Sequence, residues 1–161
     1  PELGHTLRKA ALELPEGFNP KTAELMSAWR AEANSDSEIA LHLYRQRGMQ
    51  ATTELRGEFA VIIADEREKV MIAIRDRFGI KPLYYSVVNG DVFFASEIKA
   101  LLALGVPAAW DLDGALGGMS RPHESTDFAG ISAVPPGCYA IAKDGVVRIY
   151  PYWKFKITSL F

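Results

Sequence analysis

Disulfide-forming cysteines, long apolar runs and an excess of one charge are all missing from this sequence. Cys138 is the only cysteine among 161 residues, so no intrachain disulfide can form and packing must supply the stability. A lone cysteine suits a reducing compartment, and we expect a cytoplasmic location. No apolar run approaches the roughly 20 residues of a membrane helix. The 18 basic and 20 acidic residues nearly cancel, which argues against binding to nucleic acid or an anionic membrane.

An initiator methionine is missing as well, because the chain opens with Pro1, and no signal peptide follows. This start predicts a processed or shortened polypeptide. What is present is the composition of a globular protein, with 48% apolar and 24% charged residues. Such a chain is long enough for one core of ordinary size, and we expect a single domain over residues 1–161.

Helix signals dominate the first third of the chain. Asn19-Pro20 is typical of a helix start, with asparagine as the N-cap and proline in the first turn. A second start is the capping box Ser35-Asp36-Ser37-Glu38. The helix that follows is expected to end at Gly48, in a left-handed conformation.

Strand signals begin at Phe59. Residues 59–64 and 70–74 are nearly continuous apolar runs around a charged turn. Asn89-Gly90 and Asp144-Gly145 predict two hairpins, over residues 83–95 and 139–150. Between them we expect a short helix that Ser96 caps and Gly105 ends, and a loop with at most one short helix over residues 111–137.

The fold class that follows is α+β, with antiparallel sheets layered with helices, because the strands come as hairpins and helices do not alternate with every strand. Strands that are apolar on both faces must be covered on both sides. The pattern therefore predicts a layered sandwich.

Several long segments then match one family in order. Residues 55–60, 75–85 and 94–101 resemble the glutaminase domain of asparagine synthetase, a class II glutamine amidotransferase domain. The segments 128–131, 134–137 and 152–153 look like the end of the same domain, and residues 35–38 are similar to the segment ahead of it. The resemblance covers about residues 35–153.

The resemblance implies an N-terminal-nucleophile hydrolase fold, in which two antiparallel sheets lie between helical layers. In that family an N-terminal cysteine attacks the side-chain amide of glutamine, with its own α-amino group as the base. Water then releases glutamate, and the ammonia passes to a second, ATP-using domain that makes asparagine. We expect neither a cofactor nor a metal.

Departures from the family pattern lie at the front of the domain. The N-terminal cysteine, the Arg-Leu-Ser-Ile segment and the Asn-Gly-Glu-Ile-Tyr-Asn segment of the family are absent. Residues 2–8 resemble what normally follows those segments, which makes residues 9–34 a helical insertion in a partial, N-terminally truncated domain. We therefore predict that the isolated chain is inactive, and that it uses glutamine only when a complementing N-terminal segment completes it. Missing strands leave sheet edges open, so a homodimer or a rearranged first segment is the alternative to a complementing peptide.

One residue is a candidate for substrate binding, and we assign none to catalysis. Asp36 matches the family's aspartate that holds the α-amino group of glutamine; otherwise it is a first-turn carboxylate that favours the helix dipole. Cys138 is internal, has no α-amino group to act as base, and is expected to be a structural thiol. Arg75 and Asp76 are expected to pair and fix their loop.

Two further functions stay open. The chain is alternatively a processed fragment or pseudoenzyme that acts by partner binding, defence or cytotoxicity. A weaker alternative is a hydrolase whose site is a loop containing His123, Glu124 and Asp127, side chains suited to acid–base work or to a divalent metal.

Overall fold

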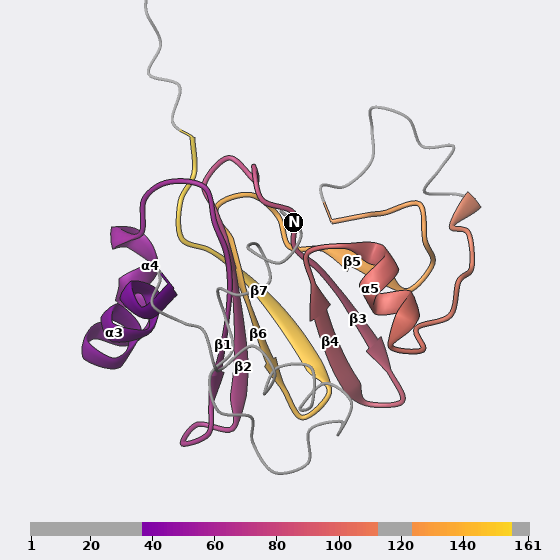
Figure 1. Ribbon diagram of the computed structural model, residues 1–161, viewed down its shortest axis with the longest axis horizontal. Helices are drawn as coiled ribbons and strands as arrows, with labels where there is room; N and C mark the ends of the chain where they lie inside the picture. Colours follow the sequence, from indigo (N-terminus) through magenta and orange to yellow (C-terminus); the bar gives the residue numbers. More distant parts are fainter. Residues whose placement is uncertain (1–36, 113–123, 156–161) are drawn as a thin grey trace, which may run out of the picture.

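The computed structural model describes residues 37–112 and 124–155, and it stacks two antiparallel sheets between helices (Figure 1). The helical elements are α3 (Ser37–Arg47), the 3-10 turn η2 (Gly48–Gln50), α4 (Ala51–Glu54) and α5 (Ile98–Ala103). The strands are β1 (Ala60–Asp65), β2 (Val70–Arg75), β3 (Tyr84–Val88), β4 (Asp91–Ala95), β5 (Ile131–Ala133), β6 (Cys138–Lys143) and β7 (Val146–Pro151). Helices α3 and α4 lie outside one sheet and α5 outside the other, which confirms the predicted α+β class.

Hairpins between neighbouring strands are joined into two sheets by pairs that are distant in the chain. The four-stranded sheet has the order β1-β2-β6-β7 and the three-stranded sheet the order β4-β3-β5, with every pair antiparallel. Asn89 and Gly90 have φ values of 54° and 86°, and Asp144 and Gly145 have 49° and 75°. Positive φ at both central residues is the requirement of a type I′ turn, so both predicted hairpins are confirmed.

Alternation along the strands sends side chains to two different cores. Val61 and Ile63 of β1 pack with Ile72 and Ile74 of β2 on the side of α3. The residues between them face the other sheet, where Ala73 is completely buried. This period of two explains why the apolar runs are nearly continuous. The four-stranded sheet is covered on both faces, as predicted.

A third core lies between α5 and the three-stranded sheet, around the fully buried Leu101. The helix ends at the predicted glycine, because Gly105 has a φ of 95° and the N–H of Val106 donates to the carbonyl of Leu101. The predicted cap at its start is wrong. Glu97 is the N-cap residue and no side-chain cap bond forms there, while Ser96 is buried.

Two short elements depart from the sequence expectations. The predicted loop over 111–137 contains β5, three residues that pair with β3. So short a strand has no pattern of its own and forms because β3 offers it a partner. The turn of η2 and α4 had no prediction, whereas the predicted end of α3 at Gly48 is confirmed by a φ of 57°. The helix start at Asn19 and the insertion 9–34 lie outside the described residues.

A close contact between two turns joins the sheets at one end. A Cβ atom added to Gly145 would lie 2.7 Å from the carbonyl oxygen of Gly90, in the hairpin of the other sheet. The two hairpin turns therefore touch through backbone atoms, and Gly145 needs both its positive φ and its missing side chain.

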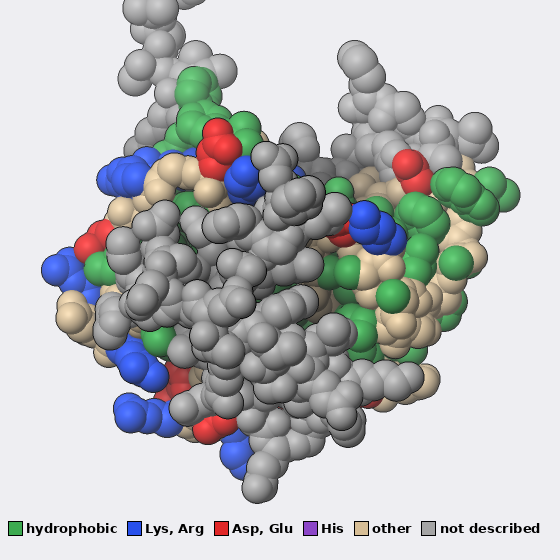
Figure 2. Space-filling model, in the orientation of Figure 1, with side chains coloured by type: hydrophobic (Ala, Val, Ile, Leu, Met, Phe, Trp, Pro, Cys, Tyr) green, Lys and Arg blue, Asp and Glu red, His purple; other side chains and the backbone are tan. Residues whose placement is uncertain are grey.

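The surface carries mixed charge. On the face in Figure 2, the Lys and Arg side chains are interspersed with Asp and Glu among the coloured residues. None of the described helices is long and apolar enough to cross a bilayer.

Candidate functional site

The predicted site residues fall largely at the limits of the described chain. Asp36, the predicted glutamine contact, directly precedes α3 and lies outside the described residues, as does His123. Glu124 and Asp127 are exposed, and the backbone of Glu124 accepts a hydrogen bond from Ala133. Within residues 37–112 and 124–155 no three His, Cys, Asp or Glu side chains are grouped as metal ligands would be.

The least exposed polar or charged residue among those described is Asp76, which follows β2 and is 1% exposed. The carboxylate of Asp76 carries the hydrogen bonds of the next loop. It accepts hydrogen bonds from the backbone N–H groups of Phe78, Ile80 and Lys81 at 2.9 to 3.1 Å. The backbone of Asp76 is also fully used, since its carbonyl accepts from Gly79 and Gly137. The loop of residues 76–81 is therefore folded around one buried charge.

Arg75 holds the same loop from the opposite side. Its guanidinium donates to three carbonyl oxygens, those of Lys81, Gly79 and Val134, at 2.8 to 2.9 Å. Burial lowers the pKa of this guanidinium, and the nearby Tyr84 and Asp76 partly offset that effect. An arginine stays charged in proteins, so its charge is balanced by carbonyl dipoles.

Arg75 and Asp76 fix the loop, but not through the expected pairing. The hydrogen bonds of both side chains go to backbone groups, and the two form no ion pair with each other. Consecutive side chains at a strand end point to opposite sides, which separates the two charged groups. The Arg75 guanidinium donates to carbonyl oxygens of the loop and of Val134, and the Asp76 carboxylate accepts from backbone N–H groups of the loop.

Two glycines let neighbouring segments approach this loop. A Cβ on Gly79 would lie 2.8 Å from Cγ of Pro136, and one on Gly137 would lie 2.7 Å from the carbonyl oxygen of Trp153. Their φ values are 68° and 65°. Both positions therefore require glycine for conformation and for space.

Tyr152 completes the arrangement, and no sequence pattern apart from the family resemblance pointed to it. Its hydroxyl donates to the carbonyl of Arg75 at 2.7 Å across 77 residues of chain. Burial, followed by the nearby Asp76, raises the pKa of this hydroxyl. Tyr152 therefore stays protonated and acts as a donor that ties the end of β7 to the end of β2.

Cys138 has the surroundings of a structural thiol. Its backbone N–H donates to the carbonyl of Pro135, so it is an ordinary amide within the chain. Burial and, to a lesser degree, Glu124 raise the pKa of the thiol, which disfavours the nucleophilic thiolate.

Comparison with known proteins decides the family. The sequence of residues 19–153 matches the family model of the glutamine amidotransferase domain. The chain belongs to this family. The domain is of the class II type, which confirms the relation to asparagine synthetase, and it is related to amidases as well.

Several curated relatives match most of this amidotransferase domain. It is 36% identical to "Amidase chry2" of Gibberella zeae over 140 residues, 86% of this chain and 21% of that protein. It is 38% identical to "Amidase chyE" of Penicillium rubens over 81% of this chain and 20% of the relative. Asparagine synthetase [glutamine-hydrolyzing] 1 of Bacillus subtilis is 38% identical over 75% of this chain and 20% of the relative. The chain thus spans about a fifth of the length of these relatives.

A solved structure supports the fold. The glutamine phosphoribosylpyrophosphate amidotransferase from B. subtilis, complexed with ADP and GMP, superimposes with a TM-score of 0.50 at 19% identity. The match covers 84% of this chain and 27% of that chain. At this identity the likeness concerns the fold alone, and it agrees with antiparallel sheets between helices.

Proposed function

We propose that this chain is part of the glutamine-hydrolysing, ammonia-supplying domain of an asparagine synthetase-type protein, and that the 161 residues by themselves do not hydrolyse glutamine. The family membership supports the first half. The second half rests on the nucleophile that amide hydrolysis by this route requires, together with a base and donors for the oxyanion.

The single observation that carries the proposal is the state of Cys138. It is the only cysteine of the 161 residues, its nitrogen is a hydrogen-bonded amide, and burial raises the pKa of its thiol. An N-terminal nucleophile needs a free α-amino group beside a reactive thiol, and Cys138 supplies neither. Removal of a nucleophile typically leaves only residual catalysis.

Each of the two described sheets has two edge strands. Among the described strands, β1 and β7 border one sheet, and β4 and β5 border the other, each with a single neighbour. A strand at such an edge presents backbone groups with which another chain can pair. This supports completion by a segment that begins with cysteine.

The test starts with a denaturing intact mass of the purified material and then measures ammonia release from L-glutamine. A lone species of 17.8 kDa without glutamine-dependent ammonia is the expected result. Glutamine-specific ammonia release by that lone species would overturn the inactivity. Addition of a peptide that begins with cysteine and carries the family's Arg-Leu-Ser-Ile and Asn-Gly-Glu-Ile-Tyr-Asn sequences should restore activity. The same peptide with serine in first place is the control and should not restore activity. Failure of the cysteine peptide to restore activity contradicts the completion model.

Within this proposal Asp36 holds the α-amino group of glutamine, as the family resemblance implies. Asp36→Asn in the completed enzyme should raise KM for glutamine at least about ten-fold, because the removed charge faces an ammonium group. Asp91→Asn changes an exposed carboxylate in a hairpin and is the matched control. An unchanged KM in Asp36→Asn assigns the residue to the helix start alone.

A further inference from the structure

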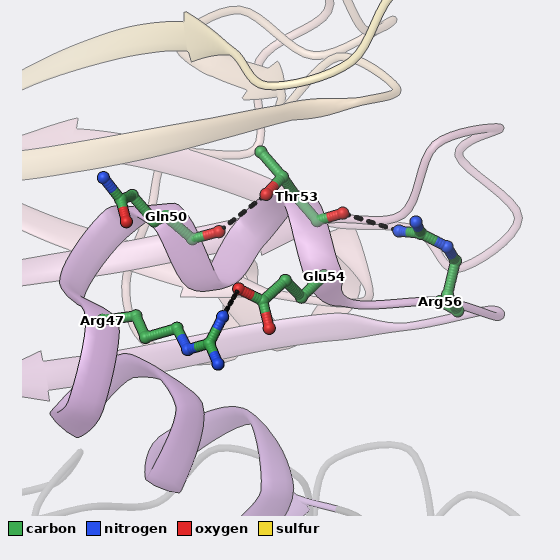
Figure 3. Close-up of polar contacts among 5 residues, drawn as sticks. All are labelled: Arg47, Gln50, Thr53, Glu54 and Arg56. Carbon is green, nitrogen blue, oxygen red and sulfur yellow. Dashed lines mark hydrogen bonds and ion pairs between the residues drawn. The ribbon is translucent and has the colours of Figure 1, made fainter.

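Two arginines from different elements converge on a single carbonyl oxygen beside the loop of residues 76–81. Arg56, just after α4, donates from Nη1 to the carbonyl of Thr53 at 2.6 Å and, over a longer distance, to that of Leu55 at 3.3 Å. Arg77, just after β2, donates from Nη2 to the same oxygen at 3.1 Å. Figure 3 shows Arg56 reaching the Thr53 carbonyl from the side opposite to Arg47.

The carbonyls of Thr53 and Leu55 do not balance two cations. A carbonyl at the end of a helix offers only a fraction of a negative charge, while two guanidinium groups this close repel each other. Of the carboxylates in the part of the chain that the structure describes, Glu54 and Glu58 are engaged elsewhere. Glu54 pairs with Arg47 at 2.6 Å, and in Figure 3 its carboxylate points away from Arg56. Glu58 pairs with Lys81 at 3.6 Å. Among the described ion pairs none includes Arg56 or Arg77.

Arg77 also has a nitrogen without an acceptor. Its Nε is shielded from solvent and makes no hydrogen bond. Its guanidinium lies over the ring of Trp153, 5.9 Å from the centroid, so one face of the group is already occupied by an aromatic ring. Buried polar atoms without partners are uncommon, and this one lies on a cation beside a second cation.

We propose that Arg56 and Arg77 together bind the oxyanion of a small ligand, a carboxylate or a phosphate group. The two donors lie within hydrogen-bonding distance of one oxygen atom, so a single oxyanion that accepts at two of its oxygens can reach both arginines. A planar guanidinium presents a fork of N–H groups that matches such an anion, and the bound charge removes the repulsion between the two arginines. This site does not depend on the glutaminase proposal.

The experiment titrates the full chain with inorganic phosphate and, separately, with glutarate, while sodium chloride keeps the ionic strength constant. The readout is the NMR signal of the Arg77 Nε–H group, with calorimetry for affinity. A saturable shift of this signal is expected with at least one of the two anions. Arg56→Gln and Arg77→Gln should each weaken binding at least about ten-fold, whereas Arg148→Gln, at an exposed arginine of β7, should stay within about two-fold.

The outcomes are distinct. Binding of phosphate alone assigns a phosphate ligand, binding of glutarate alone assigns a carboxylate, and either supports the proposal. No saturable shift up to about 50 mM of both anions overturns it and leaves the arginines as caps of α4. Equal weakening in all three variants also overturns it, because that pattern indicates general charge attraction. Arg56 is exposed, so Arg56→Gln tests the site even where Arg77→Gln disturbs the fold.

Discussion

Arg75 and Arg77 lie two residues apart at the end of β2, yet their surroundings differ completely. Each of the three guanidinium nitrogens of Arg75 donates to a carbonyl oxygen, two in the loop of residues 76–81 and one at Val134. Arg77 shares a single carbonyl with Arg56 and has a buried nitrogen without a partner. The same residue type thus serves as internal support at one position and, among the described residues, as a cation without an ion-pair partner at the other. The difference arises from the neighbouring segments, because the loop of residues 76–81 closes around Arg75 and leaves Arg77 beside α4.

The largest effect is expected from Asp76→Ala, which removes the internal anion of the loop. Three backbone N–H groups lose their buried acceptor, and the free energy of unfolding should fall by about 3 kcal/mol. Urea unfolding followed by circular dichroism measures this loss. Asp91→Ala, at an exposed carboxylate, should change the free energy by about 0.5 kcal/mol or less. Equal losses in both variants would contradict the structural role of Asp76.

Arg75→Gln and Arg77→Gln compare the two arginines directly. Arg75→Gln leaves carbonyls without donors and should cost about 3 kcal/mol. Arg77→Gln should cost about 0.5 kcal/mol or less, because it also removes repulsion from Arg56. The same urea experiment separates them, and a larger loss for Arg77→Gln would reverse the assigned roles.

Gly79→Ala tests how tightly the loop is packed. The new Cβ would lie 2.8 Å from Pro136 at a φ of 68°, and we expect a loss of about 2 kcal/mol. Gly57→Ala, beside Arg56, has a φ of 98° but nothing within 4 Å, and should cost about 1 kcal/mol. Thermal unfolding of both variants gives the difference due to crowding. Equal losses of stability in the two variants would mean that Pro136 moves aside without a measurable cost.

Tyr152→Phe removes one donor from the support around Arg75. The carbonyl of Arg75 loses its hydrogen bond, and about 1 kcal/mol of stability should be lost. Tyr150→Phe is the control, since this exposed ring stacks on Tyr139 and keeps that contact without its hydroxyl. Indistinguishable unfolding curves for the two variants would show that the bond across 77 residues contributes nothing.

The smallest effect concerns Asp65, a more exposed carboxylate than Asp76. Burial alone would raise its pKa, but hydrogen bonds from Tyr44 and from the N–H groups of Glu68 and Arg67 lower it below 3.8. Asp65 therefore stabilises the fold above its unfolded pKa, and this contribution disappears as the pH falls through the folded pKa.

Tyr44→Phe removes the 2.7 Å hydrogen bond to Asp65 and reduces the difference between the pKa values of Asp65 in the folded and unfolded states. Stability near pH 6 should fall by about 0.5 kcal/mol after allowance for solvent screening, and less stability should be lost on acidification to about pH 3. Urea unfolding at the two pH values tests this. An acid sensitivity equal to that of the unaltered protein would remove Tyr44 as the cause of the lowered pKa.

The elements with a local physical cause could be predicted from the sequence. Asn89-Gly90 and Asp144-Gly145 adopt positive φ at low cost, so both hairpins formed where expected. Gly48 and Gly105 ended helices for the same reason. The capping bond of Ser96 did not form, because the helix begins at Ile98 and Glu97 occupies the N-cap position. The strand Ile131–Ala133 was missed because its partner in the sheet lies more than 40 residues away in the chain.

The sequence by itself determined the fold class, the two hairpins and the family, because turn chemistry, alternation and long matching segments are all properties of neighbouring residues. Asp36 stays a prediction from that resemblance. Only the tertiary structure decided that Arg75 and Asp76 bind backbone groups instead of each other, that Tyr152 closes the loop, and that Arg56 and Arg77 meet at Thr53. The physical reason is that each of these contacts joins residues from separate elements, and their distances are fixed only when the sheets and helices pack.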